Sequence, residues 1–260
     1  MTNSRNHNCL PNTIVQFLAA NNFATVDRAF SISGGCIHQA YGVELSSGES
    51  LFVKTSPASA AHSVFESEAL ALERLAQNIP EGVPKVIAYN NSCLVLELLD
   101  TKDKNAAYWE GLAVLLAQLH RPIVVSFGFE SDNFCGATPQ PNHLTGNGYD
   151  FFAEHRLLFQ VKKAADSGKC GQELVSDVEV LCNRLPELIP QMPPVLIHGD
   201  LWSGNCLNTS AGPKLIDPAC YYGWAEAELA MTRLFGGFNE SFYSSYEALA
   251  PLEKLSLIHI

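Results

Sequence analysis

The chain has 260 residues and a formal net charge of −11, from 16 Lys and Arg against 27 Asp and Glu. This length suits one or two domains, and the acidic excess repels a phosphate backbone, so we expect no nucleic-acid partner. Hydrophobic residues make up 47% of the chain and charged residues 17%, a composition that excludes intrinsic disorder.

No apolar run approaches the roughly 18 residues that a membrane-spanning helix needs. The N-terminal residues 1–11 are polar and lack the apolar stretch of a signal peptide. We therefore expect a cytoplasmic protein with no membrane partner. The eight cysteines are scattered without any C-x-x-C pair, a pattern that argues against a zinc site and against a disulfide framework.

The first hundred residues predict a small sheet with one inserted helix. A first helix is expected to begin with Asn12 or Thr13 as its cap, because Ile14, Phe17 and Leu18 recur at helical spacing. Short β-rich runs bounded by turn residues follow it. The expected strands are 29–32, 38–45, 50–54, 83–88 and 93–98, and the expected inserted helix is 63–75.

After residue 100 the pattern becomes mainly helical. Residues 127–148 are rich in Gly, Pro and Asn and predict a long surface excursion. The fold class is therefore α+β with two lobes, residues 1–100 forming a β-rich lobe with a hinge and residues 101–260 a helical lobe. The expected helices are 106–120, 149–165, 173–185 and 226–235, and the expected strands are 195–197 and 214–216.

The strongest chemical signal is the run His198-Gly199-Asp200-Leu201-Trp202-Ser203-Gly204-Asn205, with Asp217 twelve residues after Asn205. An Asp followed five positions later by Asn, after an apolar strand, is typical of phosphotransferases. In those enzymes the Asp accepts the proton of the substrate hydroxyl, while the Asn and a later Asp hold Mg²⁺ against the triphosphate of ATP. Gly, Asp and Asn also serve simple loop geometry, which is the alternative reading.

Three weaker signals precede this run in the order that ATP-dependent phosphoryl transfer requires. Gly34 and Gly35 lie between two strands, where backbone N–H groups could approach phosphates, although two glycines also suit a plain hairpin. Lys54 ends an apolar strand, where a buried ammonium needs an anionic partner. Glu66 or Glu68, 12 and 14 residues later on the expected helix, could supply it.

The sequence resembles the fructosamine kinases, also called ketosamine-3-kinases, over roughly residues 10–250. The resemblance is carried above all by the catalytic run, which is specific to this family. It is also carried by Gly34-Gly35-Cys36-Ile37, Phe52–Thr55, Phe65–Glu68, Phe127–Phe129, Asp132-Asn133, Gly136, Gln140–Asn142, Phe151–Gln160 and Leu229–Phe238. It implies a protein-kinase-like fold, related to that of aminoglycoside phosphotransferases. It also implies phosphorylation of the 3-hydroxyl of a sugar joined to an amine, a protein deglycation step.

The same resemblance implies a role for each matching residue, with ATP and Mg²⁺ as cofactors. The base falls on Asp200, and Trp202 lies where a sugar or amine could rest, although a core aromatic is an equal alternative. The metal ligands fall on Asn205 and Asp217, the phosphate contacts on Gly34, Gly35 and Lys54, the helix partner on Glu68, and the adenine-binding hinge on Glu97, Leu98 and Leu99.

Three departures from the family pattern stand out. His38 occupies a position that is usually Asn, and the residues Tyr222–Glu228 differ from the family's Tyr-Gly-His-Arg-Glu-x-Asp, which puts in doubt the support of the catalytic loop. Residues 254–260 do not resemble the family's C-terminal helix, so we expect a shortened C-terminus. The alternatives are therefore a kinase of another amine alcohol, such as an aminoglycoside, and a non-catalytic nucleotide-binding fragment.

Cys36 directly follows the two glycines of the predicted phosphate loop. Backbone N–H groups arranged for a phosphate would also stabilise a thiolate, and relatives with a thiol here suggest redox control through a disulfide between two subunits. The alternative is a small residue packed under the loop. We expect a monomer or a redox-linked homodimer that acts on a small ketosamine or a glycated protein lysine.

Overall fold

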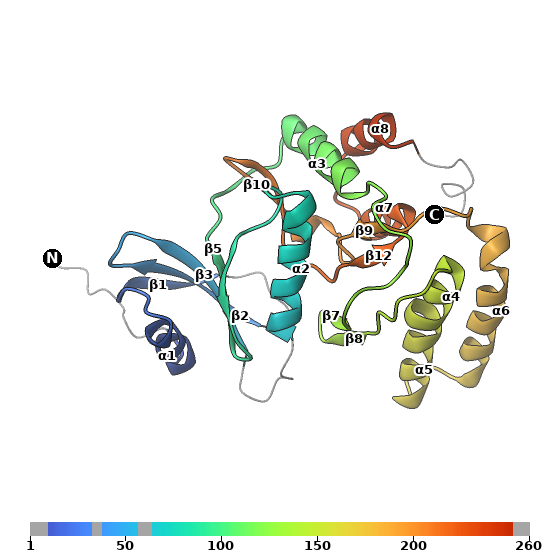
Figure 1. Ribbon diagram of the computed structural model, residues 1–260, viewed down its shortest axis with the longest axis horizontal. Coiled ribbons are helices and arrows are strands. Elements are labelled where there is room, and N and C mark those ends of the chain that lie inside the picture. The colour runs from blue at the N-terminus through green and yellow to red at the C-terminus, as the bar shows by residue number, and fades with distance from the viewer. Residues whose placement is uncertain (1–9, 33–37, 57–63, 252–260) are drawn as a thin grey trace.

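The structure, a computed structural model, describes residues 10–32, 38–56 and 64–251. A β-rich lobe carries the N-terminal part of the chain and a larger, mainly helical lobe follows it, with helix α2 between them (Figure 1). This confirms the α+β, two-lobed prediction. The glycines and the cysteine of the predicted phosphate loop, Gly34, Gly35 and Cys36, lie outside the described residues, as do residues 252–260.

The small lobe is a five-stranded antiparallel sheet. Its spatial order is β1-β2-β3-β5-β4. Each strand follows from a β-branched or aromatic run bounded by turn residues, as with Gly48, which adopts a φ of +90° in the turn between β2 and β3. The strands are β1 (Val26–Ile32), β2 (Gln39–Leu45), β3 (Ser50–Thr55), β4 (Val86–Tyr89) and β5 (Cys93–Glu97).

A helix covers each face of this sheet. Helix α1 (Asn12–Ala20) buries Ile14, Phe17 and Leu18 against one face. Helix α2 (Val64–Asn78) buries its apolar side against the other face, in a cluster that continues into the large lobe. The predicted side-chain cap of α1 is wrong: Pro11 occupies the cap position, and its carbonyl accepts the N–H of Ile14 at 3.0 Å.

The large lobe combines helices with short strand pairs. Strand β6 (Thr101–Lys102), just after the hinge, pairs with β10 and so joins a large-lobe sheet. The last helix, α8, packs on α3. The other elements are α3 (Ala106–Leu119), β7 (Asn133–Cys135), β8 (Thr138–Gln140), α4 (Gly148–Phe152), a π-helical turn (Ala153–Leu158), α5 (Phe159–Asp166), α6 (Gln172–Leu188), β9 (Val195–Ile197), a 3₁₀ turn (Ser203–Asn205), β10 (Cys206–Thr209), β11 (Gly212–Leu215), β12 (Tyr221–Gly223), α7 (Ala225–Phe235) and α8 (Glu240–Leu249).

The prediction of a surface excursion over residues 127–148 is wrong. Phe127 and Phe129 are buried in the large-lobe core, and β7 and β8 form a hairpin. Two buried amide side chains hold this hairpin to the segment after Asp217: Asn133 Nδ2 donates to the carbonyl of Cys220 at 2.8 Å, and Gln140 Nε2 donates to the carbonyl of Ala219 at 3.0 Å. Buried amides of this kind satisfy backbone groups that no strand partner reaches.

In the part of the chain that the structure describes, no helix has both the length and the apolar character to cross a membrane.

Candidate active site

The catalytic run lies on a loop that leaves the buried strand β9. Strand β9 pairs with β12, and its three residues are buried, which fixes where the loop begins. Gly199 adopts a φ of +80°, and a Cβ there would lie 2.1 Å from the carbonyl oxygen of Ala219. Only glycine allows this close approach of the loop to the segment after Asp217.

Asp200 and Asn205 are hydrogen-bonded to each other across the loop. The side-chain nitrogen of Asn205 donates to the backbone carbonyl of Asp200 at 2.8 Å and to its Oδ2 at 3.1 Å. A 3₁₀ turn over Ser203–Asn205 brings the amide back to the carboxylate five residues earlier. Because the nitrogen faces Asp200, the amide oxygen of Asn205 is left to face another group.

His198 joins the catalytic loop to the residue before Asp217. Its Nδ1 accepts the N–H of Asp200 at 3.3 Å, so its Nε2 carries the proton and donates to the carbonyl of Ile216 at 2.9 Å. The N–H of Ile216 in turn donates to the carbonyl of Asn205 at 3.0 Å. Asp217 is thereby held beside Asn205, with a φ of +56° that is uncommon outside glycine.

Lys54 connects the sheet, helix α2 and the large lobe. Its Nζ lies 2.7 Å from Oε1 of Glu68 and also pairs with the carboxylate of Asp217. Burial alone would lower the pKa of Lys54, but the carboxylates of Glu68 and Asp217 outweigh burial and raise the pKa above its usual value. Glu66, the alternative partner, is exposed.

The surroundings of Asp200 suit a proton acceptor. Burial, assisted by the charge of Asp217, raises the pKa of Asp200 above its usual value, while His198 and the amide of Asn205 oppose that rise. Cys135, on the β7–β8 hairpin, lies within hydrogen-bonding reach of the same carboxylate. Trp202 is 38% exposed, with its ring over Gly204, so it is not a core aromatic.

A buried carboxylate that the sequence reasoning did not select supports the loop. Glu228, on α7, accepts the backbone N–H groups of His198 at 3.1 Å and of Gly199 at 2.8 Å. It also contacts Nε2 of His120 at 2.9 Å, and Nδ1 of His120 meets the hydroxyl of Tyr246 on α8. The doubt about support of the loop is thus resolved, because Glu228 provides it where the family pattern has Asp.

The predicted hinge follows β5 directly. Leu98 and Leu99 are half-buried, and the side chain of Glu97 accepts the N–H of Lys85 at 3.2 Å. The backbone N–H of Glu97 also donates, to the carbonyl of Lys85 at 3.0 Å. The chain then enters strand β6 of the large-lobe sheet.

The oxygen atoms gathered at the site fit a hard cation. The carboxylate of Asp217, 38% exposed, and the free amide oxygen of Asn205 are one charged and one neutral oxygen ligand. Mg²⁺ commonly takes only one or two protein oxygens and fills its shell with water and phosphate. Among the described residues no group of three or more His, Cys, Asp or Glu side chains is arranged to hold a metal ion.

Comparison with known proteins agrees with this geometry. A probable ketoamine kinase of Synechocystis is 41% identical over 86% of this chain and 76% of its own length. A ketosamine-3-kinase of Mus musculus is 33% identical over 84% of this chain and 80% of its own length. A solved structure from Thermobifida fusca, assigned as a fructosamine-3-kinase, is 31% identical, covers 95% of this chain and 88% of its own, and superposes with a TM-score of 0.87. The model of the fructosamine kinase family matches residues 11–255, and the chain belongs to that family.

Proposed function

We propose that the chain is an ATP-dependent kinase that phosphorylates the 3-hydroxyl of ketosamines, the sugar–amine adducts of early glycation. The observation that carries the proposal is the convergence of Asp200, Asn205 and Asp217 with the buried pair of Lys54 and Glu68. The names of the relatives, ketoamine kinase and ketosamine-3-kinase, support the acceptor class.

The nucleotide would lie between the lobes. Lys54, held by Glu68, would contact the α- and β-phosphates, and the backbone of Glu97, Leu98 and Leu99 would hold the adenine. Gly34 and Gly35 would cover the phosphates with backbone N–H groups. The pairing of β6 with β10 supports a division into a nucleotide-binding lobe, residues 1–100, and a catalytic lobe from residue 101.

Asn205 and Asp217 would hold Mg²⁺ through the two oxygen ligands described above. When bound, the ion neutralises charge on the phosphates. The hydrogen bond from Ile216 to Asn205 fixes the spacing of the two ligands, and the ion pair with Lys54 orients the carboxylate of Asp217.

Asp200 would orient the acceptor hydroxyl and accept its proton as the phosphoryl group leaves ATP. Its raised pKa makes the carboxylate a better proton acceptor, and the amide of Asn205 fixes its direction. The exposed ring of Trp202 offers an apolar face for the sugar or the amine. We propose the cytoplasm as the site of action, on a small ketosamine or a glycated protein lysine, by a monomer or a redox-linked homodimer.

An acceptor panel tests the proposal. Purified protein with Mg²⁺ and ATP is assayed for ADP release with fructosyl-lysine, ribulosyl-lysine and an aminoglycoside. We expect turnover with the first two and none with the third. Turnover only with the aminoglycoside would assign the other class of kinase, and ATP binding without any turnover would support the non-catalytic alternative.

Substitution of the proposed base is the second test. Asp200→Asn should lower kcat at least about 100-fold while ATP binding is retained, because general-base catalysis commonly contributes that much. An unchanged kcat in this variant would exclude Asp200 as the base.

A further inference from the structure

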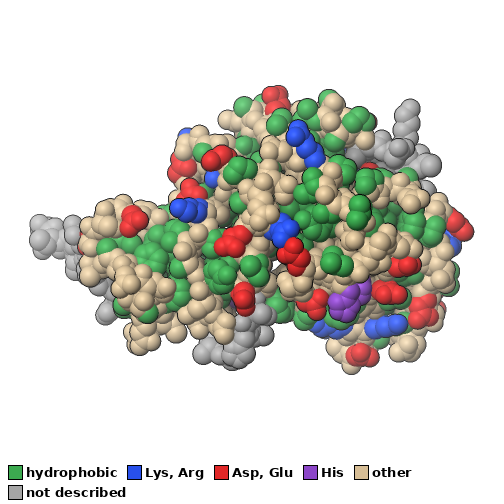
Figure 2. Space-filling model, viewed as in Figure 1, with side chains coloured by type: hydrophobic (Ala, Val, Ile, Leu, Met, Phe, Trp, Pro, Cys, Tyr) green, Lys and Arg blue, Asp and Glu red, His purple; other side chains and the backbone are tan. Residues whose placement is uncertain are grey.

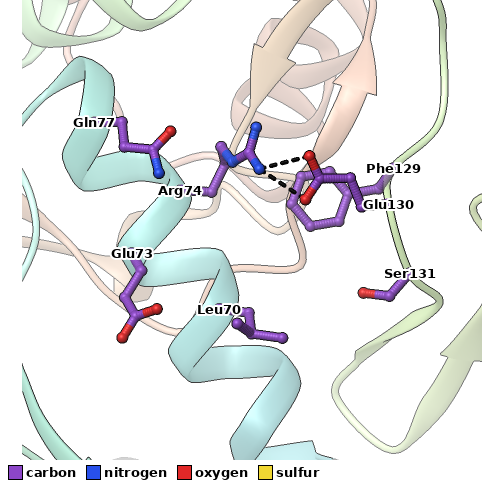
Figure 3. A pocket seen from close by; sticks show the side chains of 7 residues that line it. All are labelled: Leu70, Glu73, Arg74, Gln77, Phe129, Glu130 and Ser131. Carbon is purple, nitrogen blue, oxygen red and sulfur yellow. Dashed lines mark hydrogen bonds and ion pairs between the residues drawn. The ribbon is translucent and has the colours of Figure 1, made fainter.

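Arg74, on helix α2, bridges to the large lobe through its guanidinium group. Nη2 donates to both carboxylate oxygens of Glu130, at 2.6 and 2.7 Å, as Figure 3 shows. Nη1 donates to the hydroxyl of Tyr222 at 3.3 Å, and the guanidinium carbon lies 5.8 Å from the ring centre of Phe129. One side chain therefore contacts three residues of the other lobe.

The segment that Arg74 reaches is tied to the catalytic loop. Gly128 and Tyr222 exchange two backbone hydrogen bonds, at 3.0 and 2.8 Å. Tyr222 lies on β12 and pairs with Leu196 of β9. Because β9 leads directly into the loop of Asp200, Arg74 is anchored to the strand pair that positions the base.

The other end of α2 carries Glu68, the partner of Lys54. Arg74 lies six residues later, about 9 Å along the helix axis. Both residues lie on one uninterrupted helix, so the position of Arg74 constrains that of Glu68.

Phe129 is buried in the same apolar cluster as α2, but beside it the contact between α2 and residues 129–131 is open. A cavity of about 110 Å³ opens there, lined by Leu70, Glu73, Arg74 and Gln77 of the helix and by Phe129, Glu130 and Ser131 opposite (Figure 3). In the space-filling view this region, between α2 and the large lobe, exposes charged side chains of both signs (Figure 2). The polar bridge therefore adds a directional contact to the apolar packing that joins the buried side of α2 to the large lobe.

We propose that Arg74 is a positioning residue for the nucleotide phosphates. Through Glu130 and Tyr222 it holds α2 at the place where Glu68 directs Lys54 toward ATP. The inference rests on the proposed function only in that Lys54 contacts the phosphates; it does not depend on which acceptor is phosphorylated.

We expect replacement of Arg74 to change the affinity for ATP only moderately, because the ion pair of Arg74 and Glu130 is partly exposed. The side chain of Arg74 is 24% exposed and that of Glu130 is 63% exposed. Ordinary surface ion pairs contribute little, but here Nη2 contacts both oxygens of Glu130 while Nη1 is anchored separately on Tyr222, which restricts the guanidinium further.

The test compares the binding of ATP with that of adenosine, both by calorimetry in the presence of MgCl₂. Adenosine has no phosphate, so a residue that acts through Lys54 should change only the affinity for ATP. Arg74→Met, which keeps most of the side-chain stem, should raise the Kd for ATP about fivefold and leave the Kd for adenosine within about twofold. Glu130→Gln, a change at an exposed side chain, should act in the same direction.

Arg28→Met is the matched control. Arg28 pairs with Glu44 at 3.0 Å, but this pair joins the edge strand β1 to its neighbour β2 within the small lobe. This variant should leave both Kd values within about twofold of wild type.

A second background shows whether Arg74 acts through Lys54. In Lys54→Met protein, adding Arg74→Met should change the Kd for ATP no further. Three results would each overturn the inference. The first is equal weakening of ATP and adenosine binding, and the second is unchanged ATP binding in both Arg74→Met and Glu130→Gln. The third is a full additional effect of Arg74→Met on the Kd for ATP in Lys54→Met protein. Wild-type protein that binds ATP but phosphorylates no ketosamine would refute the proposed acceptor and leave this test intact. Wild-type protein that binds no ATP would overturn both the proposed function and the role of Arg74.

Discussion

The carboxylate of Glu228 accepts a 2.8 Å hydrogen bond from the backbone N–H of Gly199. The same carboxylate also accepts the N–H of His198 and contacts His120, so two helices of the large lobe are joined to the catalytic loop through it. Burial would raise the pKa of Glu228, but the hydrogen bond and charge of His120, with further contributions from His198 and Gly199, lower it below its usual value. Glu228 is therefore ionised at neutral pH and holds the loop as an anion.

Glu228→Gln should destabilise the protein and slow the reaction. The amide keeps the shape but loses the charge that two backbone donors and His120 share, so the free energy of unfolding at pH 7 should fall by about 2–4 kcal/mol. Because the pKa is lower in the folded state, this contribution is fully present above the unfolded-state pKa and is lost as the pH falls through the folded-state pKa. Urea unfolding should show the wild-type advantage shrinking below about pH 4.

Glu247→Gln, a change at an exposed position of α8, is the control for Glu228→Gln and should leave the unfolding free energy nearly unchanged. A wild-type advantage over Glu228→Gln that is equal at pH 7 and at acid pH would contradict an ionised Glu228.

Lys54→Met and Glu68→Gln should both reduce kcat, the first more than the second. Loss of Lys54 removes the cation that faces the phosphates, for which we expect at least about a 100-fold decrease. Glu68→Gln keeps the ammonium group of Lys54 but removes the carboxylate that holds it in position, and we expect kcat to fall about tenfold. Steady-state kinetics with Glu66→Gln as the matched control measures this, since Glu66 is exposed on the same helix turn. A Glu66→Gln enzyme as slow as Glu68→Gln would contradict the assignment.

The sequence predicted the parts of the site whose partners lie close along the chain or on regular elements. Apolar periodicity placed α2 and β3 and left Glu66 or Glu68 as the partner of Lys54; the family resemblance favoured Glu68, which the structure shows in contact with Lys54. The five-residue spacing from Asp200 to Asn205 predicted that both lie on one loop after an apolar strand, and the hydrogen bond between their side chains is what the structure adds.

The parts that the sequence did not predict depend on tertiary contacts between distant segments. Glu228 is about thirty residues from the loop that it holds, and only the family pattern over Tyr222–Glu228 connected this segment with the loop, without showing which side chain reaches it. Asn133 and Gln140 look like loop residues, yet they are buried because they satisfy the backbone after Asp217. Two signals were present: the pair of aromatic residues in Phe127-Gly128-Phe129, which a solvated excursion does not require, and the family resemblance of Asp132-Asn133 and Gln140–Asn142.

Gly199→Ala should abolish most of the activity. A Cβ at this position would lie 2.1 Å from the carbonyl oxygen of Ala219, and the φ of +80° is itself unfavourable for alanine. The loop must move away from the segment after Asp217, so we expect kcat to fall at least about tenfold and the unfolding free energy to fall by about 2–4 kcal/mol. Gly146→Ala, where the Cβ meets open space, is the control. Normal kcat in Gly199→Ala would show that the loop tolerates this shift.

The last prediction concerns the response of the kinase to oxidation. The six cysteines among the described residues are free. Burial, then the carboxylate of Asp200, raises the pKa of the Cys135 thiol to about 11, and burial raises that of Cys206 to about 12. The pKa values of Cys93, Cys182 and Cys220 are also raised, by burial. Since the thiolate is the reactive form, these thiols should react slowly with peroxide at neutral pH.

Cys36, outside the described residues, follows the two glycines of the predicted phosphate loop and is therefore the expected target. Mild peroxide should lower the wild-type kinase rate, added thiol should restore it, and a dimer band should appear on non-reducing electrophoresis. Cys36→Ala should resist this treatment, whereas Cys135→Ala, the control next to Asp200, should stay as sensitive as wild type. Equal inhibition of Cys36→Ala, or resistance in Cys135→Ala, would place the redox-sensitive thiol elsewhere. Protection of Cys36 by prior addition of Mg²⁺ and ATP would tie its reactivity to the phosphate loop, because bound phosphates would occupy the N–H groups that stabilise the thiolate.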